Sequence, residues 1–164
     1  MRLAGWECII AGPGDEDYLN QLQTLCRVEN VQDSVRFLPA TEGDDKWRLD
    51  DSADPFILPS HSENFGLVIV EALTAAVPVI TTQSTPWCEL VEHDCGWWVA
   101  DEFNAVLQAL SDATKMDASQ LRQKGERGRR LIESKYTWDG VGKAMAMVYE
   151  WLLRGGDAPD SVSL

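Results

Sequence analysis

Short apolar runs that alternate with helical patterns constrain the fold of this chain more than any other feature of its sequence. Each run is bounded by glycine, proline or a polar turn, which is typical of strands in a parallel sheet. The runs expected to form strands cover residues 6–11, 35–39, 55–59, 78–82 and 96–99. Because helical patterns separate them, we predict an α/β fold with a parallel sheet, helices on both of its faces, and ligands beyond the carboxyl ends of the strands.

Apolar residues at three- and four-residue steps mark most of the helices in the remaining segments. The expected helices cover residues 18–26, 44–49, 67–76, 87–92, 103–110, 119–133 and 138–152. Thr137 is a suitable N-cap for the last helix, and Gly155-Gly156 ends it. The sequence shows neither a repeat nor a linker, so we expect one domain over residues 1–154 and a flexible tail over residues 155–164.

The composition predicts a soluble protein, because 45% of residues are hydrophobic, 25% are charged, and no uncharged apolar stretch is long enough for a membrane span. The chain reaches Glu7 before any long apolar run, so we expect no secretory signal and a cytoplasmic location. The cysteines are spaced too widely for a zinc site and are too few for a disulfide scaffold. We therefore expect reduced, mostly buried thiols at Cys8, Cys26, Cys88 and Cys95.

The net charge of −13, from 14 basic and 27 acidic residues, excludes nucleic acid and anionic lipid as direct ligands. No Lys or Arg occurs between Arg48 and Lys115, whereas eleven acidic residues lie from Asp50 to Asp112. An anion bound by this stretch must therefore be held by backbone N–H groups or by cations from elsewhere.

The segment Gly12-Pro13-Gly14 follows a predicted strand and precedes a predicted helix, as in a dinucleotide-binding loop. However, Asp17 stands where a third glycine would be needed, and two more acidic residues precede it. We interpret the segment as a tight turn with acidic residues at a helix N-terminus, where they are electrostatically favourable.

The loop Ser60–Gly66 joins the third predicted strand to a strongly apolar helix. Free N–H groups at the start of that helix can bind an anion or sugar hydroxyls. Glu63 and Glu71 are eight residues apart, and eight helical steps of about 100° bring Glu71 within about 80° of the direction of Glu63. Both carboxylates can then face one cleft; alternatively, Glu63 only begins the helix and Glu71 points to solvent.

The run Ala53–Leu73, with two glutamates separated by seven residues after a Pro-Ser pair, resembles the signature of bacterial family-four retaining glycosyltransferases. Further segments similar to the lipopolysaccharide- and capsule-type members occur in the same order at residues 10–15, 78–82, 85–87 and 95–99. The resemblance covers about residues 6 to 153. It implies a Rossmann-like sheet that forms the C-terminal, donor-binding half of a GT-B fold.

The resemblance also implies roles for individual residues. Glu63 is implied to act at the reacting face by contacting the donor sugar, and Glu71 to accept hydrogen bonds from the ribose hydroxyls. The backbone N–H groups implied to contact the sugar and diphosphate belong to Asn64, Phe65, Gly66 and Leu67. Contacts to the nucleotide base are expected near Arg36, Phe37 and Leu38. His61 can reach the cleft, although a loop histidine more often makes an ordinary backbone contact.

The reaction implied is retaining transfer of a hexose from a nucleoside-diphosphate sugar to a glycan or lipid-linked acceptor, in cell-surface polysaccharide or lipopolysaccharide synthesis. The resemblance implies no metal and no cofactor, and it allows the complete enzyme to lie against the inner face of the membrane. Two other functions remain open: a non-catalytic module that binds nucleotide sugars or proteins, and a half-enzyme completed by a partner chain.

The sequence departs from the family pattern at its start. The family's donor domain begins with a further strand and a helix that carries an Arg and a Lys, and an acceptor-binding domain precedes it. Neither is recognisable in this sequence, so we expect the sheet to lack a strand between residues 8–11 and 56–59. The flanking strands must pair directly or a second copy of the chain must fill the gap, and we expect such a homo-oligomer.

Two further residue groups have simple structural interpretations. The seven tryptophans are expected to serve mainly in packing, with Trp138 and Trp151 on helix faces and Trp97-Trp98 in a strand. A basic cluster on the helix at 119–133 is expected to be a solvated face. Its members are Lys124, Arg127, Arg129 and Arg130.

Overall fold

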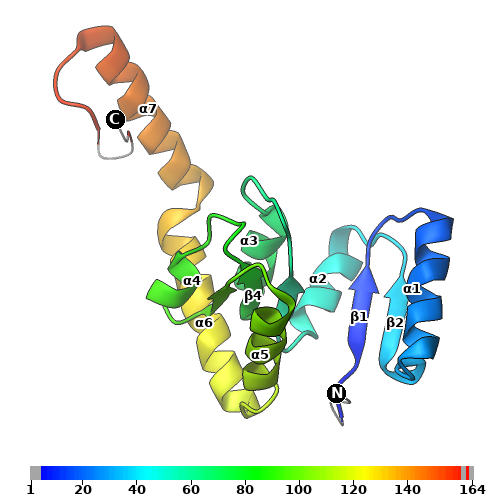
Figure 1. Cartoon of the computed structure of the whole chain (residues 1–164). Coiled ribbons are helices and arrows are strands. Elements are labelled where there is room, and N and C mark those ends of the chain that lie inside the picture. Colours follow the sequence, from blue (N-terminus) through cyan, green and yellow to red (C-terminus); the bar gives the residue numbers. More distant parts are fainter. Residues whose placement is uncertain (1–4, 160–161, 163–164) are drawn as a thin grey trace. The chain divides into compact units, whose positions relative to one another are not determined.

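A computed structural model describes residues 5–159 and 162 of the chain. It confirms the expected alternation of strands and helices (Figure 1). The chain divides into two compact units, one up to Leu49 and the other from Asp50 on. The single domain over residues 1–154 stays a prediction. Residues 160–161 and 163–164 of the predicted tail lie outside the described residues.

The first unit contains two parallel strands, β1 (Cys8–Ala11) and β2 (Val35–Leu38), in a register that places Cys8 opposite Val35. Helix α1 (Glu16–Val28) and the short η1 (Gln32–Ser34) connect them. Asp15 caps α1 by accepting hydrogen bonds from the N–H groups of Asp17 and Tyr18, at 2.9 and 3.2 Å. The acidic helix start that the sequence predicted is therefore confirmed.

Helix α2 (Gly43–Asp51) leads along the chain into the second unit, which holds a three-stranded parallel sheet in the order β3-β4-β5. These strands are β3 (Phe56–Leu58), β4 (Val79–Thr82) and β5 (Gly96–Val99). Strand β4 is central, and all four of its residues are buried. The centre of the sheet is therefore the core of this unit.

Helices cover both faces of this sheet, as predicted (Figure 1). Val79 of β4 belongs to the cluster formed with α3 (Leu67–Thr74) and α6 (Ala118–Lys135). The next residue, Ile80, belongs to the cluster formed with α5 (Phe103–Ala113). Neighbouring residues of a strand face opposite sides, so the apolar sequence of β4 is explained by a core on each face.

Helix α6 lies unusually close to the connection between α3 and β4. A Cβ atom built on Gly125 would be 1.7 Å from the carbonyl oxygen of Ala76, and one on Gly128 would be 2.5 Å from a methyl of Leu73. Only a residue without a side chain fits such an approach. Gly125 thus lets α6 pack directly onto the backbone that precedes β4, and Gly128 lets it pack onto the side chain of Leu73.

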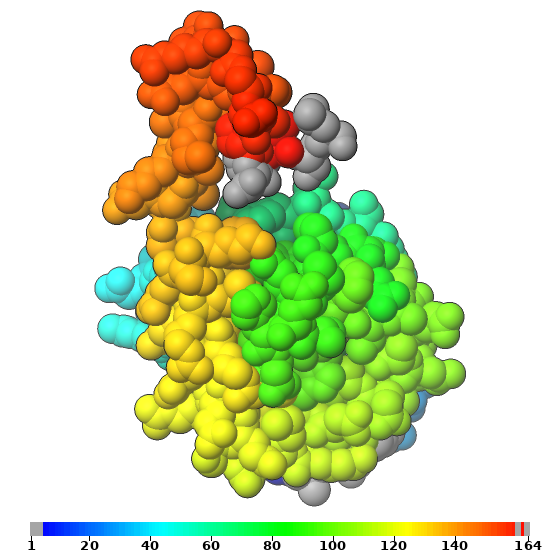
Figure 2. Space-filling view, turned by 90° about the vertical axis from the view of Figure 1, so that its left-hand side faces the viewer, coloured from blue at the N-terminus to red at the C-terminus, as the bar shows by residue number. Residues whose placement is uncertain are grey.

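The remaining helices are α4 (Glu89–Glu92) and α7 (Trp138–Arg154). Thr137 caps α7 as predicted, by accepting a hydrogen bond from the N–H of Gly140. The expected packing of Trp138 is wrong, because this side chain is 90% exposed and α7 contains no buried residue. Figure 2 shows α7, in orange, standing apart from the surface formed by α4 to α6. No helix among the described residues is long and apolar enough to span a membrane.

Burial also corrects two other expectations. All four cysteines lie in the described part of the chain and are free, but Cys95 alone is buried, while Cys8 and Cys88 are exposed. In the basic cluster, Lys124 is buried and forms an ion pair with Asp94, which Arg127 also contacts at 2.7 Å. The helix therefore uses these cations to bind the turn before β5 and does not present them all to solvent.

The strand pairings bear on the expected gap in the sheet. Among the described residues, β1 pairs with β2 in one sheet, and β3 pairs with β4 in another. Whether residues 8–11 pair with residues 56–59 stays a prediction. The expected association of two copies stays a prediction.

Candidate functional site

The loops that follow β3, β4 and β5 are joined by hydrogen bonds at the carboxyl edge of the sheet. The N–H of Glu63, after β3, donates to the carbonyl of Ser84, after β4, at 3.3 Å. The Ser84 hydroxyl donates to the carboxylate of Asp101, after β5, at 3.1 Å. Residues from three strands therefore converge where ligands of parallel α/β sheets bind.

Threonines of β4 fix the chain as it leaves β3. The hydroxyl of Thr81 donates to the Leu58 carbonyl at 2.8 Å, and that of Thr82 donates to the Ser60 carbonyl. Both threonines are fully buried. Sequence reasoning missed these anchors, although two threonines at the end of a buried apolar strand are a signal of buried hydroxyls that need acceptors.

The candidate loop ends at Gly66, whose φ of +76° lies in the left-handed region. A Cβ atom there would be 3.2 Å from the Cγ of Glu63 and 3.1 Å from the Cδ1 of Ile69. Gly66 is the N-cap of α3, and no side chain of the described residues caps this helix. The first N–H groups of α3, at Leu67 and Val68, therefore remain available, and both residues are exposed.

The two predicted glutamates lie on this loop and helix. Glu63 is half-buried, and its carboxylate accepts a hydrogen bond from the N–H of Asn64 at 3.0 Å. The N–H expected to serve a ligand is therefore engaged by Glu63 in this structure. Glu71 is half-buried in the second turn of α3. That both carboxylates face one cleft stays a prediction.

His61 makes a contact different from the expected one. Its Nδ1 lies 2.9 Å from the Oδ2 of Asp101, so the histidine contacts a side chain and not the backbone. The imidazole is 89% exposed. The hydrogen bond to His61 lowers the pKa of the Asp101 carboxyl, which is thereby kept ionised near the carboxyl edge of β5.

A cluster of three aromatic side chains holds the Ser60–Gly66 loop through Phe65. The indole N–H of Trp87 donates to the carbonyl of Phe65, and Trp87 is 1% exposed. The rings of Phe65, Trp87 and Tyr136 lie with their centroids 5.4 to 5.7 Å apart. Sequence reasoning assigned most tryptophans to packing, but it could not pair this N–H with a carbonyl that precedes it by 22 residues.

Glu89, the first residue of α4, binds Tyr136 of this aromatic cluster. Its carboxylate accepts hydrogen bonds from the Tyr136 hydroxyl and from Lys135. Burial disfavours the charged form of Glu89, but the hydrogen bonds from Lys135 and Tyr136 outweigh it and lower the pKa of this carboxyl. Burial and the contact with Glu89 raise the pKa of Tyr136, so its hydroxyl stays protonated and donates.

The residues expected near the nucleotide base belong to the first unit. Arg36 lies on β2, where its guanidinium forms an ion pair with Glu7 at 3.1 Å. Phe37 and Leu38 of the same strand are half-buried. Their contact with a base stays a prediction. No group of three His, Cys, Asp or Glu side chains within the described ranges is arranged to hold a metal, and metal independence likewise stays a prediction.

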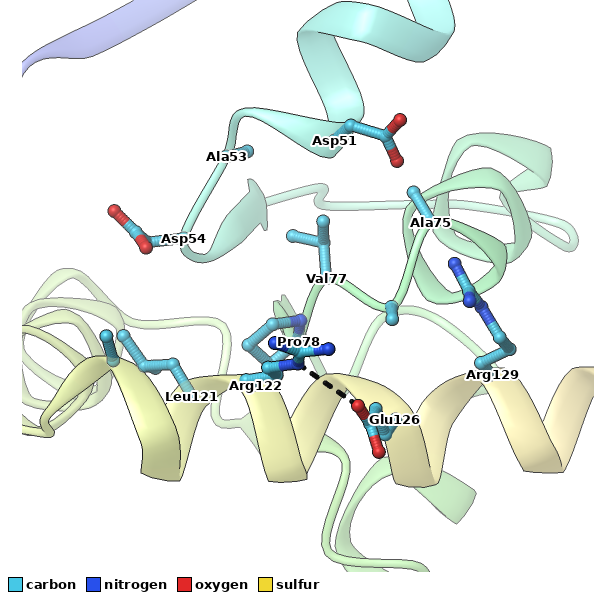
Figure 3. A pocket seen from close by; sticks show the side chains of 12 residues that line it. Asp51, Ala53, Asp54, Ala75, Val77, Pro78, Leu121, Arg122, Glu126 and Arg129 are labelled. Carbon is cyan, nitrogen blue, oxygen red and sulfur yellow. Dashed lines mark hydrogen bonds and ion pairs between the residues drawn. The ribbon is translucent and has the colours of Figure 1, made fainter.

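A cavity of about 290 Å³ lies elsewhere in the second unit (Figure 3). Its lining includes Asp54 before β3 and Pro78 before β4, so it is at the amino ends of the strands. Arg122, Glu126 and Arg129 of α6 reach it, and Arg122 pairs with Glu126 at 3.2 Å. This cavity is at the opposite end of the sheet from the Gly66 loop and is not the predicted site.

Known proteins of similar sequence include glycosyltransferases. The chain is 31% identical to an uncharacterised glycosyltransferase of Methanocaldococcus jannaschii and 33% identical to a D-inositol 3-phosphate glycosyltransferase of Jonesia denitrificans. Each match covers 87% of this chain but 36% and 34% of the relative, so the chain spans about a third of their length.

Solved structures show the same fold. Anabaena HepE in complex with UDP superposes with a TM-score of 0.77 at 21% identity, over 88% of this chain and 41% of that one. Sucrose-phosphate synthase of Thermosynechococcus elongatus gives a TM-score of 0.76 at 22% identity, over 90% and 39%. These neighbours confirm the predicted half of a GT-B fold. The sequence profile of the family "Glycosyl transferases group 1" matches residues 2–131, and the chain therefore belongs to this glycosyltransferase family.

Proposed function

We propose that this chain is the donor-binding domain of a retaining glycosyltransferase that takes a hexose from a nucleoside-diphosphate sugar. The observation that carries the proposal is the convergence of Glu63, Ser84 and Asp101 at the carboxyl edge of the sheet, beside the uncapped start of α3. The acceptor is a glycan or a lipid-linked glycan in cell-surface polysaccharide or lipopolysaccharide synthesis. Family membership and the fold shared with HepE, which was solved with UDP, support this proposal.

The diphosphate is bound by backbone groups. The second unit has no Lys or Arg before Lys115, so side-chain cations of that stretch cannot neutralise the phosphates. The N–H groups of Gly66, Leu67 and Val68 supply hydrogen bonds, and the positive end of the α3 dipole favours an anion. These fixed dipoles stabilise the diphosphate as negative charge develops on it when the glycosidic bond breaks. The proposed site uses no metal.

The two glutamates bind the neutral parts of the donor. Glu63 changes its partner on binding: its carboxylate leaves the N–H of Asn64 and accepts from the sugar hydroxyls, which frees that N–H for the sugar or diphosphate. Glu71 accepts hydrogen bonds from the ribose hydroxyls. We also propose a cytoplasmic location, supported by four free cysteines in the described part of the chain.

Calorimetric titration of the chain with UDP-glucose, GDP-mannose and ADP-glucose tests this function. We expect one of them to bind with a dissociation constant on the order of 1 mM, because Glu63 and Asp101 lie at the site and no Lys or Arg occurs between Arg48 and Lys115. Glu71→Gln should weaken that binding by about tenfold and leave the melting temperature unchanged. The matched control is Glu150→Gln, on an exposed position of α7. If none of the three ligands binds, the proposal is wrong.

A further inference from the structure

One hydrogen bond fixes the direction of the peptide that leads into the proposed site. The indole N–H of the buried Trp87 donates to the carbonyl of Phe65. In a trans peptide the carbonyl and the following N–H point to opposite sides of the same plane. The N–H of Gly66 must therefore point away from Trp87, and its direction is set as long as the indole holds the carbonyl.

Without the bond from Trp87, the backbone dihedrals at Gly66 would be only weakly restrained. Gly66 has a φ of +76°, and glycine populates positive and negative φ about equally. A side-chain cap that would fix the helix start is missing among the described residues around α3. The bond from Trp87 thus restrains the residue that precedes the uncapped N–H groups.

Trp87 is itself held firmly. Its ring contacts those of Phe65 and Tyr136, with centroids 5.4 Å away in each case. The Tyr136 hydroxyl is in turn bound to Glu89, the first residue of α4. The Phe65 carbonyl is therefore bound to a side chain that is buried and in contact with two other aromatic rings, and not to a mobile surface group.

We propose that Trp87 is a positioning residue of the donor site: it orients the Phe65–Gly66 peptide so that the N–H of Gly66 points toward the donor diphosphate. This inference rests on the proposed function and deepens it, because it names the side chain that orients this backbone N–H. Trp87 itself does not touch the donor.

The test removes the N–H and keeps an aromatic ring. In Trp87→Phe, the NMR order parameter of the Gly66 N–H should fall from about 0.85, a rigid value, to below about 0.6. Affinity for whichever of UDP-glucose, GDP-mannose and ADP-glucose binds the unaltered chain best should fall roughly fivefold. The matched control is Trp151→Phe on α7, which removes an indole N–H that donates at 3.0 Å to the carbonyl of Gly156, after the end of that helix. The control should change neither quantity.

Replacement of Trp87 by β-(3-benzothienyl)alanine covers the case in which phenylalanine leaves a cavity that prevents folding. This residue keeps the size of the indole ring system and lacks its N–H. An unchanged Gly66 order parameter in the folded variant overturns the inference, and so does a mobile Gly66 with unchanged donor affinity. If the unaltered chain binds none of the three donors, the proposed function and the donor role of Trp87 fail together. The order parameter still reports separately whether Trp87 fixes the peptide.

Discussion

Strands β1 and β4 are both four residues long and lie in parallel sheets, but their burial differs strongly. All four residues of β4 are buried, whereas only Ile9 of β1 is half-buried and the other three are exposed. Strand β4 has hydrogen-bonded neighbours on both sides and packs against α3 and α5, while β1 pairs with β2. An apolar run thus predicts a strand, but the number of elements around it decides how much it contributes to stability.

The difference predicts that the two units resist unfolding unequally. The two clusters of buried apolar side chains lie in the second unit, and none of the elements wholly inside the first unit contains a fully buried residue in the part of the chain described. Regions with few buried contacts open at lower free energy than core elements. The first unit should therefore open before the second as denaturant is added.

The largest effect is expected from matched truncations of the two strands. Ile80→Ala should lower the free energy of unfolding by about 3 kcal/mol, because Ile80 is 1% exposed in the core. Ile10→Ala should lower it by less than about 1 kcal/mol, since Ile10 is 43% exposed. Urea unfolding followed by circular dichroism measures both. Equal losses would show that the exposure of β1 in this structure is not its state in solution.

A second comparison uses glycines. Gly125→Ala should cost about 3 kcal/mol, because the new Cβ would overlap the Ala76 carbonyl. Gly14→Ala, in the first unit, places its Cβ in open space and should change the free energy of unfolding by less than about 0.5 kcal/mol. The same urea titration applies. A tolerated Gly125→Ala would mean that α6 does not lie directly on the α3–β4 connection.

Acid should weaken the second unit through Glu89. The hydrogen bonds from Lys135 and Tyr136 outweigh burial and lower the pKa of Glu89 in the folded state from its ordinary value of 4.5. Its stabilisation is therefore complete above pH 4.5 and is lost as the pH falls through the lowered pKa. Between pH 6 and 3, Glu89→Gln should flatten the decline in unfolding free energy by on the order of 1 kcal/mol. An identical decline in the variant would assign the loss to other carboxylates.

The smallest effect concerns the sheet edges. Strand β3 is hydrogen-bonded on one side, to β4, and β1 on one side, to β2, among the strands described. Open edges favour association, so light scattering should show the mean mass rising with protein concentration. Ile9→Lys should suppress the rise if β1 provides the contact, whereas an unchanged rise in this variant would assign the contact to β3. A constant mass at every concentration would contradict association.

Local signals in the sequence were enough to predict the elements and their order. Apolar runs indicated the strands, and the cap at Thr137 lies where that side chain predicted a helix start. Contacts between distant residues were not predictable in this way. His61 contacts Asp101, forty residues later, and Lys124 contacts Asp94, thirty residues earlier. No local sequence pattern indicates either pair.

Helical periodicity also has a limit that α7 illustrates. The spacing of Trp138, Val141 and Met145 correctly indicates one face of a helix, but it does not say what covers that face. In this structure all three side chains are exposed. For the candidate site, the pattern proposed the loop and both glutamates, whereas the threonine and tryptophan bonds that shape the loop join residues 23 and 22 positions apart.

The threonine anchors have a consequence for protein engineering. Because Thr81 and Thr82 of β4 hold the Leu58 and Ser60 carbonyls, the shape of the loop is encoded partly on a strand that follows it by some twenty residues. A transplant of the loop alone into another sheet would leave those two carbonyls without their partners. The smallest continuous segment that carries the loop with its threonine and tryptophan partners runs from Phe56 to Trp87.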